Sequence, residues 1–161
     1  MGYWDADLAT PLSTIPEFIE KFQSSRALVA VSGSRILRLG TSIHRSIFGH
    51  YFGRVFAMVT SNILNILIYD TQCGAKLFRT EHAELIFSEH FISRWFFDVE
   101  LFARSIELMG REKTFNSIYE MPLSKWHEQG ESKVSWGNII WTPIELLRIY
   151  YHYRHRMNNS D

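Results

Sequence analysis

The fold class of this chain follows from Ala27-Leu28-Val29-Ala30-Val31-Ser32-Gly33-Ser34-Arg35, in which five consecutive apolar residues precede a short polar run. A continuous apolar run of this length is typical of a strand at the centre of a sheet. The polar residues then lie at the carboxyl end of the strand, and ligands of open α/β sheets bind at that edge. The stretch therefore predicts an α/β protein with a mostly parallel sheet flanked by helices.

Segments on both sides of this strand alternate between strand and helix patterns. Gly2-Tyr3-Trp4 is predicted to end a strand, and Thr14 to Glu17 has the capping-box pattern of a short helix. Apolar residues recur every four positions from Ile43 to Ile63, which predicts a long helix with a wide apolar face. The remaining segments predict helices over 81–88, 97–109 and 143–156, and a strand over 117–126.

The composition indicates one globular domain of balanced charge. The 161 residues are 46% hydrophobic and 21% charged, which is enough apolar material for a single core. Seventeen basic residues balance seventeen acidic ones, so no overall field attracts nucleic acid. The single Cys73 excludes an internal disulfide. The N-terminus lacks a signal-peptide pattern. The uncharged run between Arg54 and Asp70 is shorter than a membrane span. We therefore expect a cytoplasmic protein.

Two carboxylates stand close together near the N-terminus. Asp5 and Asp7 flank one small residue, and in an extended or turning segment both can approach one hard cation. Oxygen ligands of this kind suit Mg²⁺ or Mn²⁺, which in turn bind a diphosphate. The alternative is a helix-capping turn before Pro11.

A longer pattern favours the metal. The string Asp5-Ala6-Asp7-Leu8-Ala9-Thr10-Pro11-Leu12 resembles the metal-binding motif of family 2 glycosyltransferases that act on polyprenyl phosphates. Further motifs follow in that family's order: Gly33-Ser34-Arg35; Arg45 with Ser46; Asp70-Thr71-Gln72-Cys73-Gly74-Ala75-Lys76-Leu77-Phe78; Arg94-Trp95; Phe97-Asp98-Val99-Glu100-Leu101; and Trp126 with Glu128, Gly130, Ser132 and Lys133. Together they resemble the dolichyl-phosphate β-glucosyltransferases most, a group similar to dolichol-phosphate mannose synthase.

This resemblance implies a fold and a reaction. The fold is of the glycosyltransferase A type, with the catalytic motifs in residues 1–134 and a C-terminal amphipathic helix in 135–161. The reaction is inverting transfer of a hexose from a nucleotide-diphosphate sugar, UDP-glucose before GDP-mannose, to a polyprenyl or dolichyl phosphate. The implied site residues are Asp5, Asp7 and Asp98 for catalysis, with Asp5 and Asp7 on the metal; Arg35, Arg45, Asp70, Gln72 and Trp95 for the donor sugar; and Ser132 and Lys133 for the acceptor phosphate.

Family members usually begin with a strand and loop that bind the base and ribose of the donor, and this chain does not contain them. We therefore expect residues 1–161 to be a partial domain with little activity on its own. Two alternative functions stay open. One is a non-catalytic interaction domain whose long apolar helix pairs with a partner or a second copy, and the other is a transferase with a non-lipid glycan acceptor.

Several residues allow two interpretations. Asp98 either binds a sugar hydroxyl and orients the acceptor or caps the helix that follows, and Asp70 either contacts the sugar or orders the turn at Gly74. Trp95 and Trp126 are either sugar platforms or core residues. The basic, aromatic helix over 143–156 either lies against anionic lipid or docks on the fold.

Overall fold

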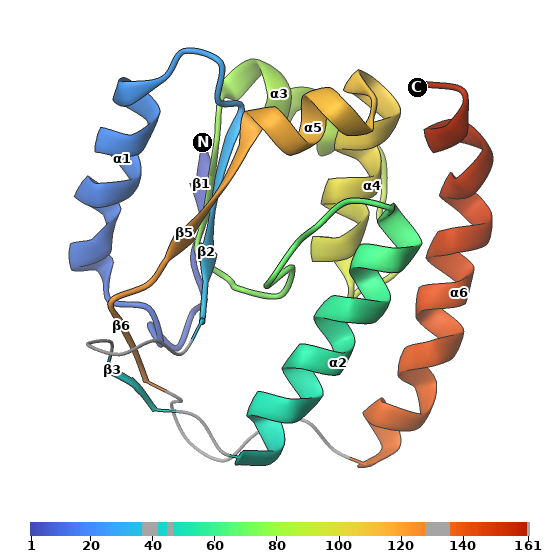
Figure 1. The fold of residues 1–161 in the computed structure, drawn as a ribbon, viewed down its shortest axis with the longest axis horizontal. Helices are drawn as coiled ribbons and strands as arrows, with labels where there is room; N and C mark the ends of the chain where they lie inside the picture. Colours follow the sequence, from blue (N-terminus) through green and yellow to red (C-terminus); the bar gives the residue numbers. More distant parts are fainter. Residues whose placement is uncertain (37–41, 45–46, 128–135, 161) are drawn as a thin grey trace.

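The computed structural model describes residues 1–36, 42–44, 47–127 and 136–160, and in them a four-stranded sheet lies between two layers of helices (Figure 1). The strand order is β1 (Gly2–Tyr3), β4 (Lys76–Phe78), β2 (Ala30–Ser34), β5 (Ile118–Pro122). Strand β4 is antiparallel to both β1 and β2, whereas β5 is parallel to β2. Strands β1, β2 and β5 therefore point the same way, and β4 alone among these four runs against them.

The prediction of a mostly parallel sheet is wrong, because the described sheet is mixed. The α/β class itself is confirmed. Strand β4 reverses because its polar motif, residues 70–74, comes before the strand and lies at the edge where the other strands end. The chain thus enters the sheet from the site edge. A strand of three residues has no sequence pattern from which its direction could be predicted.

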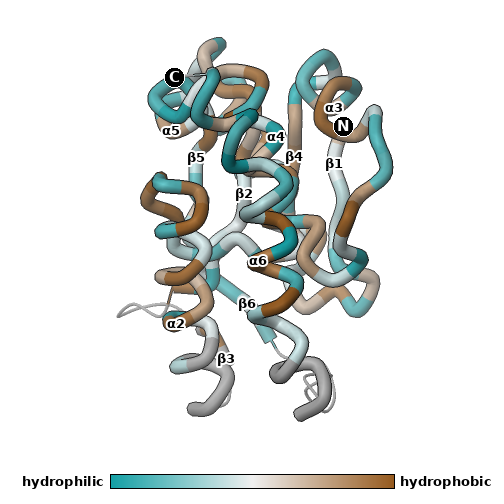
Figure 2. The backbone as a smooth tube through the Cα atoms, turned by 90° about the vertical axis from the view of Figure 1, so that its right-hand side faces the viewer, coloured by the Kyte–Doolittle hydropathy of each residue, from teal (hydrophilic) through white to brown (hydrophobic). Residues whose placement is uncertain are grey.

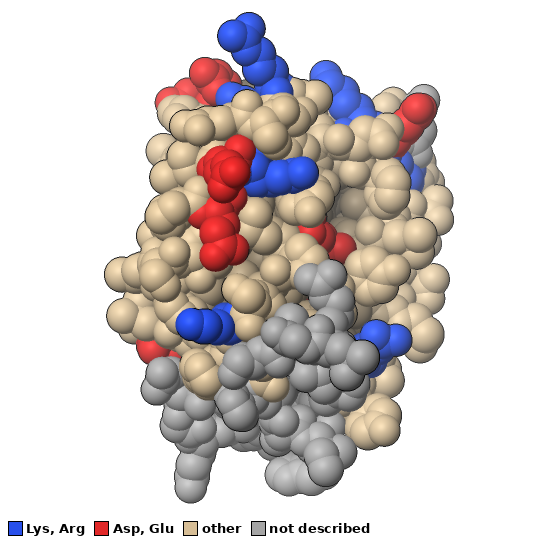
Figure 3. All heavy atoms as spheres, turned by 60° about the vertical axis from the view of Figure 1, so that its left-hand side comes forward, with Lys and Arg blue, Asp and Glu red and all other residues tan. Residues whose placement is uncertain are grey.

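The two faces of the sheet are covered by different helices. On one face, α1 (Ile15–Ser24) follows the 3-10 helix η1 (Leu12–Thr14) and buries Phe18 against Val31 of β2. A proline stands in the first turn of α1 as predicted, but the Thr14 side chain makes no capping hydrogen bond. Acidic and basic side chains are interspersed on the side of the molecule that carries α1 (Figure 3).

On the other face lie α2 (Ile47–Leu64), α3 (Thr80–Ile86), α4 (Phe97–Met109), α5 (Arg111–Ser117) and α6 (Trp136–Asn158). The largest cluster of buried apolar side chains lies among α2, α4 and α6. Helix α4 has the predicted bounds and ends at Gly110, whose φ of 79° favours glycine. None of the helices in the described part of the chain combines the length and apolar character that a membrane span requires.

A buried polar network joins α6 to α4. Glu100 is fully buried and accepts hydrogen bonds from the amides of Ile92 and Ser93 and from the hydroxyl of Tyr153 on α6. Arg104 donates to the same Tyr153 hydroxyl and to the carbonyls of residues 86, 89 and 90. The network therefore fixes the loop before α4 and the terminal helix together.

Several predicted elements differ from the structure. The long helix begins at Ile47 rather than Ile43, because Ser42–His44 forms β3, which pairs in parallel with β6 (Lys125–His127). The strand expected over 117–126 is divided into β5 and β6, with β5 ending at Pro122. Helix α5 and strand β4 were not predicted, and the terminal helix extends beyond 143–156 on both sides.

Candidate active site

The candidate site lies at the edge where β1, β2 and β5 end and β4 begins. Four segments meet there: the loop after β1, the end of β2, the loop before β4, and β6. Direct contacts join them. A Cβ on Gly74 would lie 2.0 Å from an Asp5 carboxylate oxygen, Arg35 lies 5.5 Å from the ring centroid of Trp126, and the His127 amide donates to the Ala9 carbonyl. Motifs far apart in the sequence are therefore neighbours in space.

Asp5 and Asp7 lie on a tight turn after β1. The Asp7 carboxylate accepts a 3.0 Å hydrogen bond from the Ala9 amide, the Asp5 carbonyl accepts one from the Leu8 amide, and Leu8 has a positive φ of 55°. Neither carboxylate caps a helix, because the residues at the N-caps of η1 and α1 are Pro11 and Thr14. The capping alternative is therefore wrong.

The environment of Asp5 is that of one member of a like-charge pair. Burial raises the pKa of Asp5, and the neighbouring Asp7 carboxylate raises it further, whereas Arg35 opposes the shift. A divalent cation between the two carboxylates would remove this repulsion.

The implied metal would have to be held by a small set of side chains at this edge. No group of three or more His, Cys, Asp or Glu side chains that could hold a metal is found among the described residues. Asp5 and Asp7 are therefore the two carboxylates that would hold an ion, and hard cations such as Mg²⁺ complete their coordination with water and substrate phosphate oxygens. The pair fits an ion held jointly by protein and diphosphate. Which metal binds, if any, stays a prediction.

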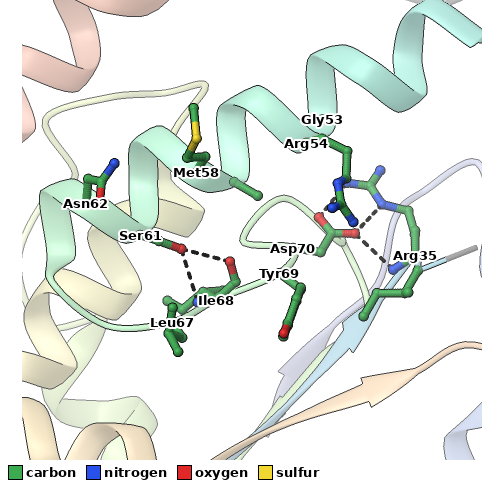
Figure 4. A pocket seen from close by; sticks show the side chains of 12 residues that line it. Arg35, Gly53, Arg54, Met58, Ser61, Asn62, Leu67, Ile68, Tyr69 and Asp70 are labelled. Atoms are coloured by element: carbon green, nitrogen blue, oxygen red, sulfur yellow. Dashed lines mark hydrogen bonds and ion pairs between the residues drawn. The ribbon is translucent and has the colours of Figure 1, made fainter.

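Arg35 and Asp70 form a bidentate ion pair beside the carboxylates. Arg35 donates from Nε at 2.7 Å and from Nη2 at 2.8 Å, and its backbone amide donates to the same carboxylate at 3.0 Å. Both side chains are mostly buried, and Figure 4 shows the Arg35 guanidinium facing the Asp70 carboxylate. This geometry orients the guanidinium firmly, since two parallel hydrogen bonds fix its plane. Contact of either residue with a sugar or phosphate stays a prediction.

Asp98 lies inside the protein, behind the loop of residues 70–74. Its carboxylate accepts hydrogen bonds from the ammonium of Lys76 and the hydroxyl of Tyr3, and it is only 6% exposed. The helix N-cap is Phe96, so the capping interpretation of Asp98 is wrong. The structure therefore gives Asp98 a partner that sequence reasoning missed, the buried Lys76 of the motif over residues 70–78.

The other predicted residues have different positions. Gln72 is partly buried in the 70–74 loop, Trp95 is 50% exposed in the loop before α4, and Trp126 is buried in the core beneath Arg35. The core interpretation of Trp126 is therefore confirmed. Arg45, Ser132 and Lys133 lie outside the described residues.

Buried side-chain atoms without a hydrogen-bond partner gather on the site segments. Within the described residues these are Thr10 Oγ1, Ser34 Oγ, Thr71 Oγ1, Gln72 Nε2 and Trp126 Nε1, with Thr114 Oγ1 and Arg154 Nε elsewhere. Buried polar atoms normally have partners, so this gathering indicates where a polar ligand would bind. Ser34 and Thr71 were missed as candidates, although both stand inside matched motifs.

A cavity of about 300 Å³ opens beside the Arg35–Asp70 pair. Figure 4 shows the pair at one end, with Met58, Ser61 and Leu67 along the wall that α2 and the following loop provide. The volume lies at the lower end of the range for small-molecule sites. The cavity thus continues the site from its charged edge toward α2.

Comparison with known proteins adds a family to this geometry. The chain is 31% identical over 154 residues to Dolichyl-phosphate beta-glucosyltransferase ALG5C of Trichomonas vaginalis, and 32% identical over 156 residues to ALG5D of the same organism. Each match covers 93% of this chain but 44% and 45% of the relatives, so the chain spans about half the length of the curated relatives it matches. No family model and no solved structure matches the chain.

The family resemblance predicted from the motifs is confirmed: over 93% of its length, this chain is similar in sequence to curated dolichyl-phosphate beta-glucosyltransferases.

Proposed function

We propose that this chain supplies the metal and sugar side of a glycosyltransferase site that moves a hexose from a nucleotide-diphosphate sugar to dolichyl or polyprenyl phosphate, with inversion. The homology to dolichyl-phosphate beta-glucosyltransferases supports this reaction class. UDP-glucose is the proposed donor and GDP-mannose the second choice. The observation that carries the proposal is the meeting of the Asp5–Asp7 pair, the Arg35–Asp70 pair and unpartnered buried polar atoms at one sheet edge.

The chemistry of such a transfer matches what this edge offers. A phosphate acceptor is already anionic near neutral pH, so the site has to neutralise charge and align the reacting groups rather than remove a proton. Asp5 and Asp7 would hold Mg²⁺ or Mn²⁺, which when bound stabilises the negative charge on the leaving diphosphate. The fixed Arg35 guanidinium would contact phosphate oxygens, and the Gln72 amide would donate to a sugar hydroxyl.

A membrane contact would suit a lipid acceptor. Helix α6 buries Leu146, Ile149 and Tyr153 against the fold, yet a second apolar set on it is exposed: Trp141, Ile144, Leu147 and Tyr151. Helix α2, which lies beside α6, exposes Tyr51, Val55 and Met58 (Figure 1). Both helices face one side of the molecule and carry hydrophobic stretches (Figure 2). We propose that this side rests on the membrane surface, since amphipathic helices bind there.

Transfer of radiolabelled sugar tests the proposal. Wild type, Asp7→Ala and the exposed control Glu84→Gln on α3 are each incubated with polyprenyl phosphate, Mn²⁺ or Mg²⁺, and UDP-glucose or GDP-mannose in separate reactions. The expected result is weak but metal-dependent transfer by wild type and by Glu84→Gln, in keeping with a partial domain, and loss of that transfer in Asp7→Ala.

Binding of UDP in the presence of Mn²⁺, measured by calorimetry, provides a second measurement. Undiminished transfer by Asp7→Ala would remove the metal role. A wild type that neither transfers sugar nor binds UDP with Mn²⁺ would refute the activity and favour a non-catalytic interaction domain.

A further inference from the structure

One row of residues crosses the described sheet beneath the loop of residues 69–74. Tyr3 of β1 is paired with Lys76 of β4, Lys76 with Ser32 of β2, and Ser32 with Glu120 of β5. Paired residues on neighbouring strands direct their side chains to the same face of a sheet. The row therefore brings a cation and an anion to the same face, on the two strands that flank β2.

Glu120 holds the start of the loop. Its carboxylate accepts hydrogen bonds from the Tyr69 amide at 2.9 and 3.0 Å and from the Asp70 amide at 2.9 Å. Burial raises the pKa of Glu120, while the two amides oppose that shift. Glu120 thereby fixes the backbone of the residue that pairs with Arg35.

Lys76 holds the rest of the loop. Its ammonium donates to the carbonyls of Thr71 at 2.9 Å and Cys73 at 2.6 Å, and its third hydrogen bond goes to Asp98. The side chain is almost fully buried, with 1% of the residue exposed. Because an ammonium has three donors and all three are used here, Lys76 has none left for a ligand.

The energetics of buried ion pairs indicate that these charged side chains position the loop backbone and add little net stability to the fold. Two buried charges pay a desolvation cost that often cancels their attraction, so apolar residues of similar size would stabilise the fold equally well. Apolar residues, however, could not hold the carbonyls of Thr71 and Cys73 or the amides of Tyr69 and Asp70. The charged groups are the ones that fix the loop backbone.

We propose that Glu120, Lys76 and Asp98 form a clamp that positions the 69–74 loop for ligand binding. The clamp fixes Asp70, which orients Arg35, and it holds Gly74 against the Asp5 carboxylate. The proposal rests on the proposed function for the identity of the ligand. It makes Asp98 a positioning residue that acts through Lys76, in place of the catalytic role implied by the family resemblance.

Cys73 provides a probe of the clamp that does not depend on sugar transfer. It is the single cysteine of the chain, it lies inside the clamped loop, and it is 1% exposed. Burial and the Asp70 carboxylate raise the pKa of its thiol to about 11, so the closed loop should react slowly with a thiol reagent. A loosened loop should react faster.

The experiment measures the rate of Cys73 labelling by a disulfide reagent in wild type, Glu120→Ala, Glu120→Gln and the double variant Lys76→Met/Asp98→Leu, with exposed Glu84→Gln as the control. The double variant replaces the buried pair by apolar side chains, so it tests the clamp without leaving a lone buried charge. Denaturant unfolding confirms that each variant is folded. Expected labelling is about tenfold faster in Glu120→Ala and in the double variant, near wild type in the control, and intermediate in Glu120→Gln, which keeps one acceptor oxygen.

The dissociation constant for UDP with Mn²⁺ is measured on the same samples. Weaker binding by folded Glu120→Ala, with partial rescue in Glu120→Gln, supports the positioning role, and wild-type binding by the two loosened variants overturns it. Wild-type labelling rates in Glu120→Ala and the double variant overturn the clamp itself, whether or not sugar is transferred. Faster labelling together with a wild type that neither binds UDP nor transfers sugar would leave the clamp standing and refute the proposed function alone.

Discussion

Replacing Asp98 by alanine should destabilise the protein strongly. The change leaves the ammonium of Lys76 without its counter-ion at a site that is 1% exposed, and it removes the acceptor of the Tyr3 hydroxyl. Breaking a buried pair by removing one partner costs about 3–5 kcal/mol. For a chain of this size each kcal/mol lowers the melting temperature by about 2–4 °C, so a shift of roughly 6–20 °C is expected.

Urea unfolding followed by circular dichroism measures this cost, and a surface pair supplies the control. Glu107 and Arg156 lie 3.5 Å apart with side chains 32% and 44% exposed, so Glu107→Ala should cost under about 1 kcal/mol. A cost for Asp98→Ala no larger than that of Glu107→Ala would refute the reasoning, because it would mean that Lys76 tolerates the loss of its partner or reaches solvent.

Three further outcomes are expected. Gly74→Ala should weaken Mn²⁺ binding about tenfold, since its Cβ would displace the Asp5 carboxylate; wild-type affinity by calorimetry would contradict this contact. Burial raises the pKa of Asp5, and a metal binds the ionised carboxylate. As the pH is lowered, Mn²⁺ affinity should therefore begin to fall at a higher pH than for an ordinary aspartate. An affinity, measured by electron paramagnetic resonance, that falls only in the usual aspartate range would argue against this environment. Leu146→Ala, at 3% exposed, should cost about 2–5 kcal/mol, and its neighbour Leu147→Ala, at 51%, under about 0.5 kcal/mol; equal unfolding midpoints would show that α6 is not docked as described.

The sequence predicted the local elements better than their arrangement. The apolar run around Val31 and the period of residues 97–109 identify a strand and a helix, because burial on one or both faces leaves a pattern in the chain. Strand β4 was not predicted, because three residues at the end of a polar segment leave no such pattern, and its direction could therefore not be predicted either. Strand β3 was read as helix because Ile43 continues the four-residue spacing of α2.

The site was predicted in part, and the missing part has a physical cause. The motif strings led to Asp5, Asp7, Arg35 and Asp70, which the structure brings to one edge. Glu120 could not be found in this way. It accepts hydrogen bonds from the amides of Tyr69 and Asp70, which lie 51 and 50 positions earlier in the sequence, and only the folded sheet brings these residues together. Polar partners buried by tertiary contacts leave no periodic pattern.

The network of Glu100, Arg104 and Tyr153 has a consequence for how the protein can be dissected. Removing α6 would take away the Tyr153 hydroxyl and uncover the Glu100 carboxylate and the Arg104 guanidinium of α4, along with the apolar side chains packed beneath Ile149. The terminal helix and the sheet therefore belong to one cooperative unit. An expression boundary placed between residues 127 and 136 would therefore divide this unit and not yield a minimal domain.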